Sequence, residues 1–138
     1  MSDHVSTPKI LGGPTSRRFS SLAASSVIDQ AIAVLPVAAI EQHGPHLPVS
    51  VNTTLVNGVI EAAVPHLSTS LPVLFMPTQL VDIKSNEHIC YPGTLMLSAQ
   101  TLINVWIELS ACVTRNLRNA HDLMVFSTNW YTCRWVMP

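Results

Sequence analysis

The feature that most constrains the fold is an unbroken apolar run at residues 31–40, AIAVLPVAAI. A run of this length without polar alternation predicts a strand buried on both faces, as in a parallel sheet covered by helices. A polar segment, EQHGPHLP, follows directly at residues 41–48. Open α/β sheets place their ligand sites at the carboxyl ends of the strands. The sequence therefore predicts a functional site in this polar segment.

Glu41 and His43 are two residues apart in that segment. In extended backbone, side chains two apart point to the same side of the chain. A carboxylate and an imidazole together suit a divalent metal such as zinc or manganese. A Glu-x-His pair is common, however, and by itself it leaves a purely structural role open.

The rest of the chain predicts strands that alternate with helices. Apolar residues at helical spacing follow Asn52, which stands where a helix N-cap is expected, and Pro65 closes this helix. A second helix is expected after Ser98, and further strands are expected at residues 71–76 and 123–126. This order predicts an α/β fold of three layers, α/β/α, around a mostly parallel sheet.

Composition limits the classes of function. The chain is 48% hydrophobic and only 11% charged, which predicts a folded domain that hides much of its surface and forms a homo-oligomer or aggregates. The net charge of −1 argues against a nucleic-acid surface. No apolar run is long enough to span a membrane. Three cysteines without metal-type spacing predict reduced thiols in a cytoplasmic protein.

Two motifs resemble the signature of the creatininase (creatinine amidohydrolase) family. The first is EQHGPHLP with the apolar run before it, and the second is SNEHICYPGT at residues 85–94. The resemblance covers residues 31–126, about the first half of a family member. It implies a three-layer α/β/α fold, assembly into hexamers, and hydrolysis of cyclic or linear amide C–N bonds in small molecules with two divalent metals, zinc or manganese.

The resemblance also implies roles for individual residues. Glu41 and His43 match the family's first glutamate and histidine ligands. Glu87 and His88 of the second motif, and His46 of the first, are candidates for the substrate side of the site. His46 is about equally well explained as a loop histidine without a role in the chemistry.

The sequence departs from the family pattern at two places. Asn52 stands where the family has an aspartate that bridges both metals, so it is at best a weak third ligand. No histidine follows His121, although the family has a histidine ligand after the third strand. We therefore expect a truncated or frame-shifted product with a flexible leader (residues 1–20), a partial creatininase-like domain (21–126) and a non-family tail (127–138) that is not a strand.

Three functions remain open from sequence. In the first, the chain is a metal-dependent amidohydrolase that is impaired or inactive on its own. Alternatively, it is a non-catalytic remnant or interaction subunit with the same fold. The third possibility is a small α/β binding domain in which the Glu-x-His pair is only structural.

Overall fold

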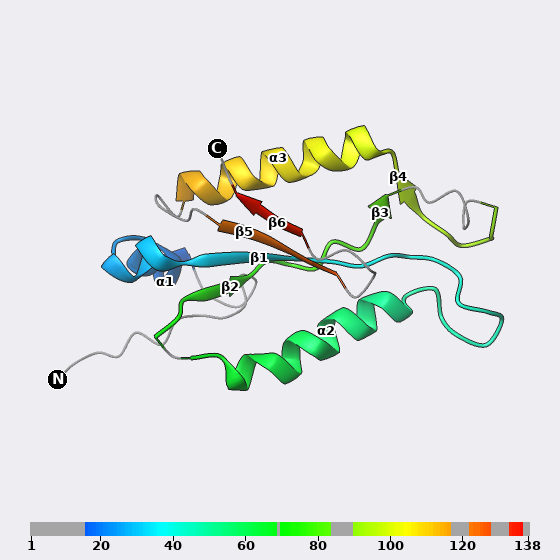
Figure 1. The fold of residues 1–138 in the computed structure, drawn as a ribbon, viewed down its shortest axis with the longest axis horizontal. Helices are drawn as coiled ribbons and strands as arrows, with labels where there is room; N and C mark the ends of the chain where they lie inside the picture. Colours follow the sequence, from blue (N-terminus) through cyan, green and yellow to red (C-terminus); the bar gives the residue numbers. More distant parts are fainter. Residues whose placement is uncertain (1–15, 69, 84–89, 117–121, 128–132, 137–138) are drawn as a thin grey trace.

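The computed structural model describes residues 16–68, 70–83, 90–116, 122–127 and 133–136. Its main sheet has the strand order β2-β1-β5-β6 (Figure 1). These strands are β1 (Ile32–Val37), β2 (Val73–Phe75), β5 (Asp122–Ser127) and β6 (Cys133–Val136). β1 pairs in parallel with both β2 and β5, and only β6 runs antiparallel to its neighbour β5. The predicted mostly parallel sheet is thus confirmed.

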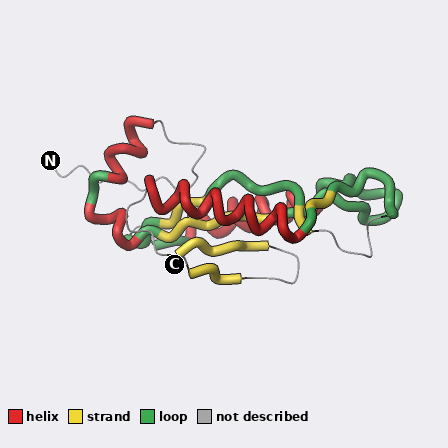
Figure 2. The backbone as a smooth tube through the Cα atoms, turned by 90° about the horizontal axis from the view of Figure 1, so that it is seen from above, coloured by secondary structure: helices red, strands yellow, loops and turns green. Residues whose placement is uncertain are grey.

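Helices cover both faces of this sheet. α2 (Val51–Ala63) lies on one side of the strands and α3 (Ala99–Asn116) on the other (Figure 1), and the view from above shows α3 lying over the strands (Figure 2). Shorter elements complete the described part: α1 (Ser16–Ala23), η1 (Ser26–Gln30), η2 (Val64–His66), β3 (Asp82–Ile83) and β4 (Met96–Leu97). The three-layer α/β/α fold is therefore confirmed.

β1 is the strand that both helical layers bury. Its alternate side chains enter two separate apolar clusters, as the pleat of a strand requires. Leu35 packs in the cluster that also contains Val113 of α3, and Val34 packs in the cluster that contains Val56 of α2. Burying one such side chain stabilises the fold by about 1.5–3 kcal/mol. Burial of β1 on both faces therefore explains the unbroken apolar run in the sequence.

Gln79 extends the pairing of β1 beyond the end of β2. Its backbone N–H donates to the carbonyl of Pro36, and its own carbonyl accepts from Ala38, both at 2.8 Å. Its side-chain oxygen accepts from Nε1 of Trp106 at 3.0 Å, which ties α3 to this edge. The partly buried Trp106 packs against the core, with its polar atom satisfied.

The ends of the chain differ from expectation in two ways. α1 begins at Ser16, so the segment 1–20 expected as a flexible leader contains the start of a helix, while residues 1–15 lie outside the described part. The expectation that the tail is not a strand is wrong, because Cys133–Val136 pairs with β5 as β6. Four residues are enough for a strand when a formed neighbour supplies the hydrogen bonds, and short segments of that kind leave little periodicity to detect.

Pro92 and Gly93 form the centre of a turn. The N–H of Thr94 donates to the carbonyl of Tyr91 at 3.3 Å, and Gly93 has a φ of +87°. Positive φ at the third residue is what a type II turn requires, and glycine adopts it without a steric penalty.

None of the helices in the described ranges is long and apolar enough to cross a membrane.

Replacing Gly93 by alanine should destabilise the fold by about 1–2 kcal/mol, because a side chain at positive φ is strained. The new Cβ would also stand 3.2 Å from Cγ1 of Val49. Gly58→Ala in α2 is the matched control, since a Cβ there meets nothing within 4 Å. That control should gain up to about 1 kcal/mol. Urea unfolding of both variants measures this difference, and equal stability of Gly93→Ala and wild type would contradict the prediction.

Candidate metal centre

Backbone hydrogen bonds fix Glu41 a short distance beyond β1, which ends at Val37. The preceding residue, Ile40, accepts a hydrogen bond from the N–H of Leu95 at 2.9 Å. The N–H of Glu41 then donates to the carbonyl of Val49 at 3.1 Å, which closes the loop of residues 41–49. The carboxylate therefore projects from a backbone that is held at both sides, at the carboxyl end of β1.

A left-handed glycine turns this loop back toward the sheet. Gly44 has a φ of +84°, and its N–H donates to the side-chain oxygen of Gln42 at 2.6 Å. A Cβ at Gly44 would stand 3.2 Å from Cε1 of His46, so this position also needs the absence of a side chain. The reversal leads into α2, whose first residues thereby face Glu41.

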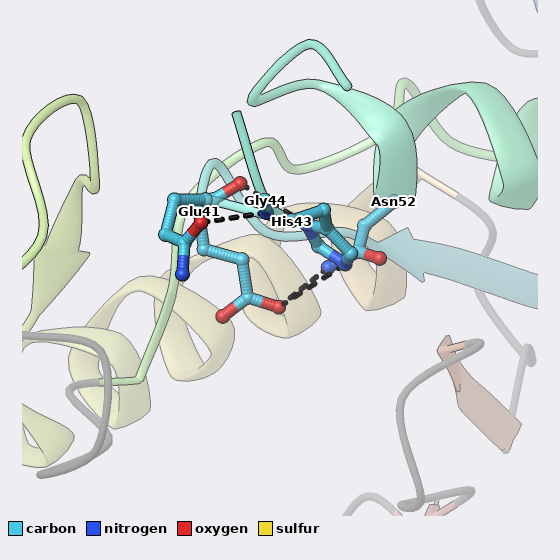
Figure 3. Close-up of polar contacts among 5 residues, drawn as sticks. Glu41, His43, Gly44 and Asn52 are labelled. Carbon is cyan, nitrogen blue, oxygen red and sulfur yellow. Dashed lines mark hydrogen bonds and ion pairs between the residues drawn. The ribbon is translucent and has the colours of Figure 1, made fainter. Parts of the chain in front are cut away.

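Asn52 lies on the first turn of α2 and points at Glu41 (Figure 3). Its side-chain nitrogen donates to Oε1 of Glu41 at 2.8 Å, and the residue is only 3% exposed. The prediction that Asn52 is the helix N-cap is wrong, because the cap position belongs to Ser50. Asn52 lies inside the first turn of α2, and from there its side-chain amide reaches Glu41.

His43 contacts Glu41 in two ways. Its Nδ1 lies 3.1 Å from the Glu41 carbonyl, and its Nε2 lies 3.9 Å from Glu41 Oε1 (Figure 3). A carbonyl oxygen only accepts, so Nδ1 carries the proton in this hydrogen bond. In the neutral ring, Nε2 then keeps a free lone pair. A backbone carbonyl on one ring nitrogen is the usual support for a histidine that binds metal through the other.

A small approach of Nε2 and Oε1 would let one divalent cation bind both atoms. They lie 3.9 Å apart, whereas tetrahedral zinc with bonds of about 2.0–2.2 Å sets two ligand atoms roughly 3.4 Å apart. Both side chains also reach solvent, His43 with 29% and Glu41 with 19% of its surface exposed. Within the described residues, no three His, Cys, Asp or Glu side chains gather into a metal cluster. The arrangement therefore offers two atoms that bind metals well, with a neutral amide beside them.

The other predicted site residues do not join this group in the described part. His46 is exposed and packs over Gly44, in the loop beyond the pair. Glu87 and His88 lie outside the described residues, so their substrate-side role stays a prediction.

A hollow of about 320 Å³ lies beside the same loop, and sequence reasoning missed it. Residues 42–49 and the turn at Tyr91-Pro92 form its walls, which are mostly apolar. The Gly-Pro pair at residues 44–45 and the Pro-Gly pair at residues 92–93 are each typical of turns, but nothing in their spacing indicates that the two segments face each other. The hollow is lined by Gln42, Gly44, Pro45, Leu47, Val49, Tyr91 and Pro92.

Comparison with known proteins identifies relatives of this chain. The sequence profile described as creatinine amidohydrolase matches residues 20–123. A mycofactocin precursor peptide peptidase of Mycobacterium tuberculosis is 30% identical over 115 residues, covering 78% of this chain and 43% of that protein. Its counterpart from Mycolicibacterium smegmatis is also 30% identical, covering 76% of this chain and 40% of that protein. The chain thus spans less than half the length of these relatives.

Solved structures of creatininases share the fold. A creatinine amidohydrolase superposes with a TM-score of 0.71 at 22% identity, covering 86% of this chain and 44% of that one. A manganese form of creatininase and a zinc–zinc form of a creatininase mutant superpose with the same TM-score at 24% identity, with the same coverage. At these identities the structures show the fold alone.

The His43 geometry predicts which nitrogen of the neutral ring carries the proton. We expect Nδ1–H for His43, because the Glu41 carbonyl accepts from it. Long-range ¹H–¹⁵N correlation spectra in the presence of a chelator distinguish the two tautomers. His66, exposed in η2, is the internal reference. A His43 ring protonated at Nε2 alone would contradict the arrangement.

Proposed function

The chain belongs to the creatininase family, and from that premise we propose that it carries a divalent-metal centre for hydrolysis of an amide C–N bond. The observation that carries the proposal is the placement of Glu41 Oε1 and His43 Nε2 3.9 Å apart at the carboxyl end of β1. The fold and the relatives support the same chemistry. Cyclic and linear amides are both candidates, since the relatives include creatinine amidohydrolases and peptide peptidases.

Glu41 and His43 would hold the metal, zinc or manganese. A divalent metal supplies water activation at neutral pH and polarises a carbonyl oxygen. The protein's own part is orientation: the Glu41 carbonyl holds the imidazole, and the Val49 carbonyl holds the Glu41 backbone. Asn52 would be a third ligand only after its amide turned to present oxygen instead of nitrogen.

The hollow beside the loop is the proposed place for the apolar part of the substrate. Its wall shares Gln42 and Gly44 with the segment that carries the metal ligands. Mostly apolar lining with a few polar groups is typical of small-molecule sites. His46, Glu87 and His88 remain our candidates for contacts to the substrate.

A non-catalytic role is the second candidate, favoured by the contact between Asn52 and Glu41. The amide already satisfies the carboxylate at 2.8 Å without any cation. A centre with one carboxylate and one neutral imidazole also carries little charge to balance metal. We therefore expect weak turnover from this chain compared with a centre that has a second carboxylate.

Association with a partner, most simply a second copy, is proposed from the outer faces of the helices. Large apolar side chains on both helical layers are exposed, whereas a surface helix usually turns a polar face to solvent. They are Leu55 and Val59 on α2 and Ile103 and Ile107 on α3. We expect light scattering after size exclusion to give a mass above 15.0 kDa; a monodisperse monomer would contradict this.

Metal titration tests the proposed centre. We expect the wild-type protein to bind zinc or manganese. His43→Ala should lose more metal affinity than the roughly 10- to 100-fold that loss of an outer-shell partner costs. Glu41→Gln should weaken binding similarly, because it removes the charge. Calorimetry measures the affinities, and assays with creatinine and with linear peptides measure hydrolysis in the same samples.

His66→Ala is the matched control, because it removes an exposed histidine from η2, which follows the far end of α2. Equal metal affinity for wild type, His66→Ala and His43→Ala would overturn the proposed centre. Metal binding without hydrolysis of either amide class would favour the non-catalytic candidate.

A further inference from the structure

We propose that Asn52 is a positioning residue: it holds the Glu41 carboxylate by donating a hydrogen bond, and it limits the centre to at most one divalent cation. This inference rests on the proposed function, because it concerns the same centre. It assigns Asn52 a role different from that of a metal ligand. The contact in question is Nδ2 of Asn52 to Oε1 of Glu41, 2.8 Å long (Figure 3).

The chemistry of the two groups fixes which atom of the amide faces Glu41. An ionised carboxylate only accepts hydrogen bonds, whereas the amide has a donor end and an acceptor end. If Oδ1 of Asn52 faced Glu41 instead, it would stand about 2.8 Å from Oε1, the length of the present contact, with no proton between the two oxygens. Because Asn52 is 3% exposed, no water layer would screen that repulsion.

This hydrogen bond leaves room for one cation at Oε1. A carboxylate oxygen has a second lone pair, and His43 Nε2 stands 3.9 Å away from the same atom. A cation held by Oε1 and Nε2 is therefore compatible with the Asn52 contact. Carboxylates that bind metal are commonly held by hydrogen bonds of this outer kind.

Among the described residues of this centre, nothing supplies the charge that would balance a second divalent cation beside the first. Glu41 contributes one negative charge, while neutral His43 and Asn52 contribute none. Two adjacent divalent cations repel strongly at short range. The amide also directs its positive end at Glu41, where a second cation would have to approach. A mutant creatininase is known in a zinc–zinc form, and in this chain we expect no such state while Asn52 donates to Glu41.

Asn52→Asp tests the role because it keeps the shape and replaces the donor by a charge. Without metal, the variant brings two buried carboxylates together, so its melting temperature in chelator should fall by at least about 3 °C. With zinc, the same pair should bind more cation, and native mass spectrometry should show a second equivalent. Wild type should bind no more than one.

Asn57→Asp is the matched control on the same helix. Asn57 is exposed, and its side-chain oxygen accepts from Thr78 at 2.6 Å, a contact that aspartate retains. This control adds the same charge to α2 without contacting Glu41. Its melting temperature in chelator and its zinc stoichiometry should match those of wild type.

The double variant Glu41→Gln with Asn52→Asp exchanges donor and acceptor across the same contact. It should recover most of the melting temperature lost by Asn52→Asp in chelator, because a glutamine amide can then donate to the new carboxylate. This variant also answers the case in which Asn52→Asp alone does not fold without metal. A merely space-filling role for Asn52 predicts no such recovery.

Three results would overturn the inference: two zinc ions in wild type, equal melting temperatures of Asn52→Asp and Asn57→Asp in chelator, or no recovery in the double variant. The proposed function fails differently. If wild type binds no zinc while Asn52→Asp is destabilised in chelator and stabilised by zinc, the role of Asn52 stands and the native metal centre does not.

Discussion

The structure depends on burial of β1 on both faces and at both edges. β2 and β5 occupy its hydrogen-bonding edges, and α2 and α3 cover its two faces. A shift of β1 by a single residue would place its side chains in the wrong one of two closely packed apolar clusters, so packing fixes its register. The position at which β1 ends is therefore fixed, and so is the first polar side chain after it, Glu41.

Burial at this position forces the polar groups of the site to satisfy one another. Glu41 is about four-fifths buried, so its carboxylate needs hydrogen-bond or ionic partners close at hand. The loop supplies them through its return to the sheet: Val49 binds the backbone, and α2 then delivers Asn52. The left-handed turn at Gly44 makes that return short. The site is thus a consequence of how the chain leaves the buried strand.

Much of this could be predicted from sequence, for physical reasons that also explain the errors. The apolar run of β1 is long and unbroken, so its burial could be predicted. The helix expected after Ser98 is α3, and the Ser98 side chain accepts from the N–H of Thr101 at its start. The proximity of Glu41 and His43 was expected from extended backbone, although both residues lie beyond the end of β1, where His43 contacts the Glu41 carbonyl. The role of Asn52 could not be predicted, because an asparagine near a helix start is typical of a cap, and the choice between cap and Glu41 is made by tertiary structure. β6 escaped prediction because its pairing depends on β5.

The aspartate that the motif resemblance implies at position 52 would fit the same fold. Asparagine and aspartate have nearly the same shape, so a position that is 3% exposed accepts either without a cavity or a clash. They differ in what they require of Glu41. An aspartate beside that carboxylate needs a cation to offset the repulsion, whereas the Asn52 amide satisfies it directly. With aspartate at position 52, folding would therefore depend on metal binding. With Asn52, the hydrogen bond to Glu41 makes folding independent of metal binding.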